Sequence, residues 1–242
     1  MEDIKEDSGK TLVELTTDRI IDYITSRQLK PGDKVPTEAE FLDKFAVSRG
    51  TLREAFKVLI ARNILESRQG AGTFISEKQG IPDDPLGLTF IYDDQMLALD
   101  MIDLRLMIEP KAAQLAAVNA TEDQKQALID MMNVLEDRIN KGESYVAEDG
   151  KFHQLIAEAT GNKIIGNLTY ILFSSIEKNI ELTLNNLSVS NTLYYHRRIL
   201  KAILEGKIFD AYNAMTNHLS LIREYMVKDY EEKQNKKEQD QI

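Results

Sequence analysis

The chain has 242 residues and a mass of 27.6 kDa; 43% of the residues are hydrophobic, 29% are charged, and the formal net charge is −10. This length allows one large globular domain or two ordinary ones, and the composition excludes a disordered, collagen-like or purely coiled-coil protein. The sequence contains no cysteine, which excludes a disulfide framework, a thiolate metal site and a cysteine nucleophile.

Neither a membrane span nor a signal peptide is expected. The most apolar of the long uncharged stretches, residues 164–176, contains Asn167, Thr169 and Ser174, and it is too short and too polar to cross a bilayer. The first twenty residues carry six acidic side chains, which is wrong for a signal peptide. We therefore expect a soluble cytoplasmic protein that does not act on a membrane.

The negative charge is concentrated in the second part of the chain. Residues 1–79 carry 13 Lys and Arg against 14 Asp and Glu, whereas the remaining residues carry 17 against 26. Within the first part, the segment from Arg49 to Arg68 has five basic side chains and two acidic ones. A locally basic segment on an acidic chain is compatible with nucleic acid as a partner, despite the overall charge.

Residues 11–76 contain, in order, a helix, a second helix, a turn, a third helix and a hairpin. The first helix is predicted from about residue 11 to 27, after a frayed N-terminus at residues 1–10. Thr37 and Glu40 have the spacing of a capping box, which starts the second helix.

The third helix and the hairpin complete the pattern. Ser48 can cap the third helix. The apolar face of this helix is formed by Leu52, Ala55, Phe56 and Leu59. Two short apolar runs, 64–67 and 73–75, flank a glycine-rich turn and are typical of a hairpin. This order of elements predicts a winged helix-turn-helix.

One face of the third helix is basic. Arg49, Arg53 and Lys57 follow one another at intervals of four residues and form one stripe, away from the apolar face. Such a helix fits the major groove of DNA, where arginine can bind guanine and lysine can neutralise phosphate. A basic stripe alone is more often only a solvated surface, but the preceding cap and turn and the following wing favour DNA binding. The candidate DNA-binding residues are Ser48, Arg49, Gly50, Thr51, Arg53, Lys57, Arg68, Gln69, Gly70 and Gly72.

Three stretches of this domain, Gly32–Phe41, Val47–Ala55 and Gly70–Phe74, resemble the DNA-binding domain of the GntR family of bacterial transcription regulators. The resemblance covers residues 11–76 and implies that this domain binds DNA. The family usually has an arginine where this chain has Ala39, and that arginine commonly contacts DNA. An operator sequence therefore does not carry over from the family to this chain.

Residues 77–94 are rich in glycine, proline and aspartate and are predicted to form a linker. From 95 to 230 the apolar spacing is helical, so the predicted fold class is mainly α, an N-terminal winged helix-turn-helix followed by an all-helical antiparallel bundle. Pro110 is expected to kink or split the first of these helices, and residues 231–242 are expected to form a loose charged tail. The predicted helices are 95–118, 122–140, 144–160, 163–186, 191–205 and 207–230. The predicted helix caps are Thr121, Ser144 and Asn191.

One aspartate and the three histidines of the chain are candidate metal ligands. They are Asp149, His153, His196 and His218. Asp149 and His153 are four residues apart and lie on one face of a predicted helix. A carboxylate and three imidazoles can bind a divalent ion such as zinc and leave positions open for water or a ligand. Taken singly, an Asp and a His at this spacing more often form a local hydrogen bond, and the other two histidines are more often surface or core residues.

The surroundings of these residues resemble the FCD domain, the all-helical effector domain of the FadR subfamily of GntR regulators. The matching stretches are Leu104–Pro110, Asp149–His153, His196–Leu200 and Met215–Leu219. The resemblance implies that the four candidate ligands line one cavity and hold a metal, zinc first and nickel or another transition metal as alternatives. It also implies a small organic acid or sugar acid as effector. Arg105 matches a position that often binds the effector carboxylate. The alternative role for Arg105 is an ion pair with Glu109, one helical turn later in the sequence.

The two resemblances together imply a bacterial transcription repressor that is not an enzyme. Such a protein would bind palindromic double-stranded operator DNA as a homodimer and release it when a small carboxylate or sugar acid binds at the metal. A metal-sensing repressor, a regulator with a purely structural metal and a metal-dependent hydrolase are the alternatives.

Overall fold

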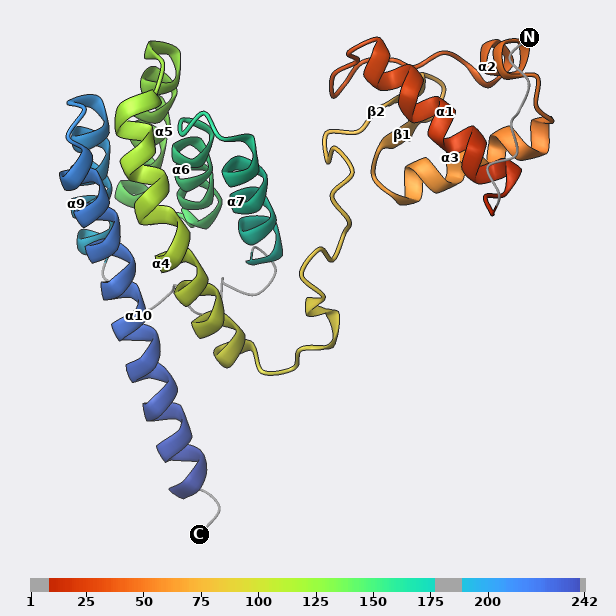
Figure 1. Ribbon diagram of the computed structural model, residues 1–242. Helices are drawn as coiled ribbons and strands as arrows, with labels where there is room; N and C mark the ends of the chain where they lie inside the picture. Colours follow the sequence, from red (N-terminus) through yellow and green to blue (C-terminus); the bar gives the residue numbers. More distant parts are fainter. Residues whose placement is uncertain (1–8, 177–188, 240–242) are drawn as a thin grey trace. The chain divides into compact units, whose positions relative to one another are not determined.

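The computed structural model describes residues 9–176 and 189–239 and divides into two compact units (Figure 1). The boundary between the units falls between Pro85 and Leu86, inside the segment predicted as a linker. None of the described helices is both long enough and apolar enough to cross a membrane.

Three helices and a hairpin form the first unit, which confirms the predicted winged helix-turn-helix. These elements are α1 (Leu12–Ser26), α2 (Glu38–Phe45), α3 (Arg49–Ala61), β1 (Leu65–Arg68) and β2 (Gly72–Ile75). The two strands pair in antiparallel fashion, with Leu65 opposite Ile75. A bridge between Lys34 and Phe74 joins the segment before α2 to the hairpin.

The predicted side-chain caps start α2 and α3. Thr37 forms a complete capping box with Glu40, and the hydroxyl of Ser48 accepts a hydrogen bond from the backbone N–H of Thr51 at 3.1 Å. Each cap satisfies a backbone donor that the helix itself leaves unpaired. Between the two helices, Ala46 adopts the left-handed conformation with φ 53°, which ends α2 and turns the chain sharply into α3.

Replacing Thr37 with alanine should lower the free energy of unfolding of the first unit by about 1 kcal/mol, because the substitution removes the hydroxyl that caps α2. For a unit of this size the melting temperature should fall by about 4–8 °C, measured by circular dichroism during heating. Thr37→Ser keeps a capping hydroxyl and is the matched control. Equal melting temperatures for the alanine and serine variants would show that the cap does not stabilise the unit.

An aromatic and aliphatic core holds α3 in place. Phe41 is fully buried, and its ring centroid lies 5.2 Å from that of Tyr23 and 5.8 Å from that of Phe56. Leu52 and Leu59 of α3 are also fully buried. Because α3 turns this apolar face inward, the side chains on its opposite face point to solvent.

The described part of the second unit is helical, which confirms the predicted fold class. Its elements are a short 3-10 helix η1 (Leu88–Phe90) and the α-helices α4 (Asp94–Asn119), α5 (Glu122–Lys141), α6 (Val146–Glu158), α7 (Lys163–Ile176), α9 (Val189–Leu204) and α10 (Ile208–Gln239). α4 packs along α10, α9 packs against α10, and α6 lies between α5 and α7 (Figure 1).

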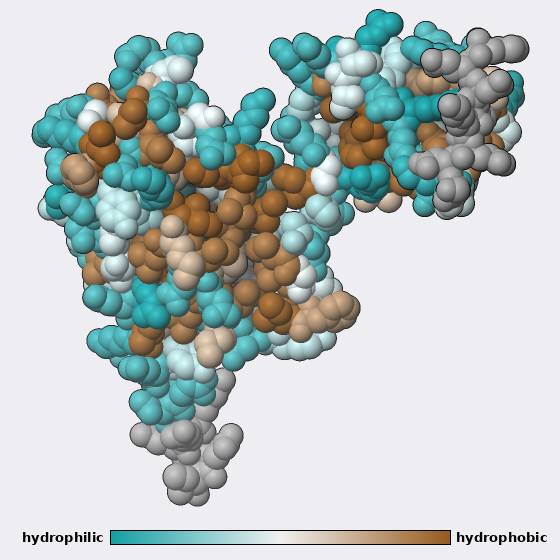
Figure 2. Space-filling model, viewed as in Figure 1, coloured by the Kyte–Doolittle hydropathy of each residue, from teal (hydrophilic) through white to brown (hydrophobic). Residues whose placement is uncertain are grey.

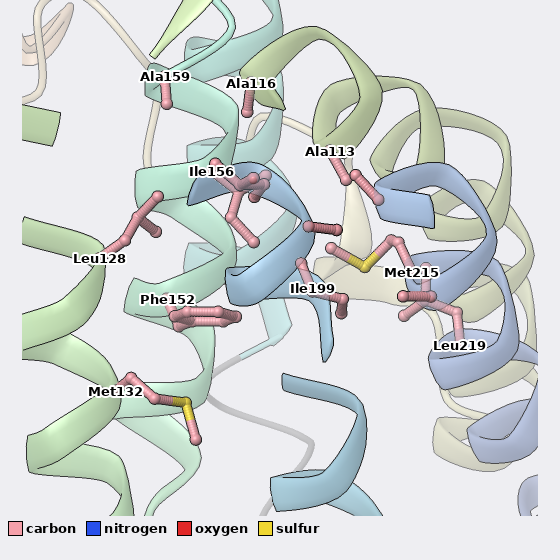
Figure 3. Packing of buried hydrophobic residues seen from close by; sticks show 14 of the residues in the cluster. Ala113, Ala116, Leu128, Met132, Phe152, Ile156, Ala159, Ile199, Met215 and Leu219 are labelled. Carbon is pink, nitrogen blue, oxygen red and sulfur yellow. The ribbon is translucent and has the colours of Figure 1, made fainter. Parts of the chain in front are cut away.

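A single large cluster of buried side chains forms the core of this unit. Figure 3 shows Phe152 of α6 among side chains from α5, α9 and α10, including Met132, Ile199 and Met215. Phe152 is fully buried, and its ring centroid lies 4.9 Å from that of His196. The apolar core therefore directly adjoins one of the candidate metal ligands.

Pro110 does not split α4, which runs through the proline without interruption. Proline removes one helical hydrogen bond and crowds the preceding turn. Here α4 packs along α10, α6 and α9, and this tertiary packing stabilises the helix more than the local sequence does.

α10 extends to Gln239, whereas the sequence predicts a loose tail from residue 231. No glycine or proline interrupts the segment 208–239, and its charges are spaced to support a helix. Lys233, for example, pairs with Asp229 one turn earlier at 2.6 Å. The charged composition therefore stabilises the last turns of α10.

The predicted starts of the other helices have mixed outcomes. Thr121 caps α5 with a complete capping box, as predicted. Ser144 is not the N-cap of α6, and Asn191 lies inside α9. The helix predicted over 163–186 is observed as α7 up to Ile176, and its remaining residues lie outside the described part of the chain.

Hydrophobic side chains also reach the surface of the helical unit (Figure 2). Met107 of α4 and Phe209 of α10 are each 76% exposed, and Ile164 of α7 is 73% exposed. A contiguous apolar patch at a surface, as opposed to single exposed apolar residues, is typical of regions that become covered when a protein assembles with a partner.

Candidate functional site

The basic stripe predicted on α3 is exposed. Arg49, Arg53 and Lys57 lie on the face opposite the core. Lys57 pairs with Glu54 at 2.8 Å, whereas Arg49 and Arg53 make no ion pair with any residue that the structure describes. Two such guanidinium groups in the first half of an exposed helix are free to approach bases and phosphates. Their contact with DNA stays a prediction.

The turn of the hairpin depends on glycine. Gly70 and Gly72 have φ values of +73° and +113°, which other residues rarely adopt. A Cβ at Gly72 would lie only 2.8 Å from Cε of Lys34. Beside the turn, Arg68 pairs with Glu66 at 2.6 Å, so the predicted wing contact carries a neighbouring negative charge.

The structure brings the four predicted metal ligands together from α6, α9 and α10. Each of Asp149, His153, His196 and His218 offers one ligand atom, and these atoms all lie within 4.8 Å of one another. Nε2 of His196 lies 3.1 Å from Nε2 of His218 and 3.3 Å from Oδ1 of Asp149. All four residues are buried. The candidate site is therefore a compact interior cluster.

Glu109 and Arg105 of α4 adjoin this cluster. Oε2 of Glu109 lies 2.6 Å from Nδ1 of His153, and Oε1 accepts a hydrogen bond from Nε of Arg105 at 2.6 Å. The ion pair that was one interpretation of Arg105 is thus present, and it is buried. A carboxylate on one ring nitrogen of a histidine is typical of metal sites, where it orients the ring and raises the basicity of the other nitrogen.

Burial and neighbouring charges set the protonation of the site. Burial lowers the pKa of His196 to about 4, and burial together with the nearby His196 lowers the pKa of His218 well below 6.5. Both rings are therefore neutral near pH 7 and keep a lone pair for a cation. Burial alone would raise the pKa of Glu109, but Arg105 and His153 outweigh it and lower the pKa to about 2.

A buried nitrogen atom without a hydrogen-bond partner also points to a cation. Nε2 of His153 has none within the described residues, and it lies 3.8 Å from Oδ2 of Asp149. An unsatisfied buried polar atom costs about 1–3 kcal/mol. Three imidazoles and a carboxylate form a ligand set that zinc and related transition ions accept, so these residues fit a divalent metal.

Replacing Glu109 with glutamine should weaken zinc binding by about 10- to 100-fold. The amide lacks the charge that orients His153 and pairs with Arg105. Competition with a chromogenic zinc chelator measures this affinity. Glu158→Gln removes an exposed carboxylate elsewhere on α6 and should leave the affinity unchanged. If both variants bind zinc as tightly as the wild type, Glu109 does not support the cluster.

Phe173 of α7 is a part of the site that the sequence did not reveal. Its ring stacks on His153 with centroids 5.6 Å apart and an interplanar angle of 27°, and the guanidinium carbon of Arg105 lies 4.7 Å from its centroid. A Cβ at Gly150 would lie 3.1 Å from the ring. No spacing in the sequence predicts that Phe173 contacts the cluster. For Glu109, the only signal was its spacing of four residues from Arg105, which predicts their ion pair but not the contact with His153.

Comparisons with known proteins agree with both parts of the chain. Residues 12–75 match the gntR family of bacterial regulatory proteins, and residues 100–221 match the FCD domain. The chain is 28% identical to the HTH-type transcriptional regulator YcbG of Bacillus subtilis, covering 96% of this chain and 98% of that protein. It is 27% identical to the galactonate operon transcriptional repressor of Escherichia coli, covering 77% and 86%.

A solved structure supports the same assignment over nearly the whole chain. The Streptococcus agalactiae GntR protein is 38% identical to this chain, with a TM-score of 0.78, and the match covers 88% of this chain and 99% of that one. The chain therefore belongs to the GntR family of bacterial regulatory proteins and is a DNA-binding transcriptional regulator with a C-terminal FCD effector domain.

Proposed function

We propose that this regulator is a repressor whose affinity for its operator is controlled by a small organic acid or sugar acid, bound at a metal in the FCD domain. The buried cluster of Asp149, His153, His196 and His218 carries the proposal. An interior site of this kind is positioned to sense a small molecule rather than a macromolecule, since its groups are removed from the surface.

Zinc is the metal that we assign to the cluster, with nickel or another transition ion as the alternative. A bound metal of this type supplies positive charge and coordination positions that accept a carboxylate or hydroxyl oxygen. The chain's own residues prepare the site for it. Glu109 orients His153, and burial keeps His196 and His218 neutral.

Arg105 supports an acidic effector. Its Nε and one Nη nitrogen lie against Glu109, and its other Nη nitrogen has no hydrogen-bond partner in the described residues. A guanidinium group with donors to spare can bind a carboxylate with planar geometry. The galactonate operon repressor of Escherichia coli, 27% identical to this chain, takes its name from the operon of a sugar acid, which supports both the effector class and the repressor role.

A homodimer on a palindromic operator completes the proposal. Two copies of α3 related by a two-fold axis would meet half-sites about 34 Å apart in successive turns of the major groove. The exposed apolar residues Met107, Ile164 and Phe209 of the helical unit are suited to such an assembly. The complex would act in the cytoplasm, where the operator DNA is located.

The test uses the zinc-loaded protein and fluorescently labelled DNA from its own promoter region. Fluorescence anisotropy is measured with a panel of small acids that includes L-lactate and D-galactonate. We expect at least one acid to weaken DNA binding about tenfold or more, which corresponds to about 1.4 kcal/mol of coupling. The effect should be absent in His196→Ala. A panel in which no acid changes the affinity contradicts the proposal.

The same titration distinguishes the alternatives. If zinc alone changes DNA affinity and no acid adds to this change, the protein is a metal-sensing repressor. If metal binds but neither zinc nor an acid affects DNA binding, the metal is structural. Hydrolysis of a carboxylic ester that is lost in His153→Ala would instead support a metal-dependent hydrolase.

A further inference from the structure

α7 contacts the metal cluster through one residue and contributes the next to a hydrophobic cluster against which the end of the linker packs. On the cluster side, Phe173 stacks on His153 at 5.6 Å and lies 4.7 Å from the guanidinium carbon of Arg105. The ring thus touches both a candidate metal ligand and the arginine beside the cluster. Any shift of His153 or Arg105 therefore acts directly on Phe173.

The adjacent residue, Leu172, belongs to a second, separate cluster. Leu172 is fully buried together with Leu97 and Met101 of α4. Leu86 and Leu88, at the end of the linker, pack against this cluster. Consecutive residues of one helix point in directions about 100° apart, so α7 presents one side chain to the site and the next to the cluster against which Leu86 and Leu88 pack.

The ring of Phe173 also has space beside it. A pocket of about 240 Å³ lies between α6 and α7, and its lining includes Gly150, Gln154, Tyr170 and Phe173 itself. A ring that borders an open pocket can change its position without displacing a closely packed neighbour. The core side of α7 has no such freedom, because Leu172 is completely enclosed.

We propose that α7 couples the metal cluster to the linker, with Phe173 responding to occupation of the cluster and Leu172 transmitting the response to Leu86 and Leu88. The inference rests on the proposed function, because it requires a metal at the cluster. The linker leads from the FCD domain to the DNA-binding unit, so a change in its attachment alters how freely the two units can be arranged on DNA. By thermodynamic linkage, weakening the linker contact must also change the affinity of the cluster for metal.

The experiment measures zinc affinity in four variants by chelator competition. Leu88→Ala weakens the linker contact, and Phe173→Leu removes the ring from His153; the third variant combines both. Phe90→Ala truncates a side chain of the same 3-10 helix that is 78% exposed and is the matched control. We expect each single substitution in the coupling route to weaken zinc binding by about 3- to 10-fold, and the control to bind like the wild type.

The double variant is decisive. If both residues act through α7, the double variant loses no more zinc affinity than the weaker-binding single variant. If the two substitutions act independently, their fold-losses in zinc affinity multiply. A second readout comes from a nitroxide label at Phe90→Cys, which is specific because the chain has no other cysteine. Zinc should reduce the mobility of this label, and Phe173→Leu should abolish that response.

Multiplicative losses, or an unchanged zinc affinity in Leu88→Ala, would overturn the coupling while leaving the metal site intact. Failure of the proposed function has a different signature. In that case His196→Ala binds zinc as tightly as the wild type, and both the proposed metal site and the coupling through α7 are wrong. Circular dichroism of each variant checks that the helical fold is retained.

Discussion

Replacing Arg49 and Arg53 together with alanine should weaken binding to promoter DNA by at least about 30-fold, since each arginine that binds a guanine edge contributes about 1–3 kcal/mol. α3 holds both side chains on its exposed face, opposite the buried Leu52 and Leu59, so neither is needed for the fold. Fluorescence anisotropy at several salt concentrations measures the loss and shows which part of it is due to phosphate contacts.

Arg62→Ala is the control for this prediction. Arg62 is exposed and lies at the C-cap of the same helix, so this variant loses one charge without changing the first half of α3. It should bind DNA nearly as tightly as the wild type. If the double variant binds as well as Arg62→Ala, α3 is not the helix that contacts DNA.

His196→Ala should remove the stabilisation that zinc gives to the helical unit. Zinc at 1,000 times its dissociation constant adds about 4.1 kcal/mol to the stability of the protein that binds it. For a chain of this size the melting temperature should rise by about 8–16 °C. His196 contacts both His218 and Asp149, so its loss removes one ligand and its contacts with two others. The variant should show no such rise.

Differential scanning calorimetry with and without zinc makes this measurement. Lys151→Ala, which changes an exposed residue of α6 close to the cluster in sequence, is the control and should respond to zinc like the wild type. A normal response in His196→Ala would show that zinc stabilises the protein from some other site.

The first unit could be predicted almost completely from the sequence, because its signals are local. The capping box of Thr37 and Glu40, the cap at Ser48 and the turn around Gly70 each depend on residues within one or two turns of one another. The apolar spacing of α3 was sufficient to separate its buried face from its basic face.

The candidate metal site could be predicted only in part from such local signals. The spacing of Asp149 and His153 places both on one face of a helix, but the approach of His196 and His218 depends on the packing of α9 and α10 against α6. Family resemblance, and not spacing, predicted that approach, which the structure bears out. The contact of Phe173 with His153 had no sequence signal, because it depends on how α7 packs against α6.

Two of the differences in the helical unit have the same origin. The split that was one of the two outcomes expected at Pro110, and the loose tail expected from residue 231, both follow from local rules on proline and on charged segments. In the structure, packing along α10 keeps α4 continuous, and ion pairs one turn apart, such as Lys233 with Asp229, keep α10 helical.

Gly150 lies in the interior of α6, where glycine is unusual. Glycine within a helix is ordinarily less favourable than alanine by roughly 0.5–1 kcal/mol, so its place beside Asp149 runs against helix propensity. Alanine here would place its methyl group 3.1 Å from the ring of Phe173. Substitutions that are usually stabilising in a helix therefore conflict with ring placement at this point, and attempts to make the protein more heat-resistant should leave Gly150 unchanged if ligand response is to be preserved.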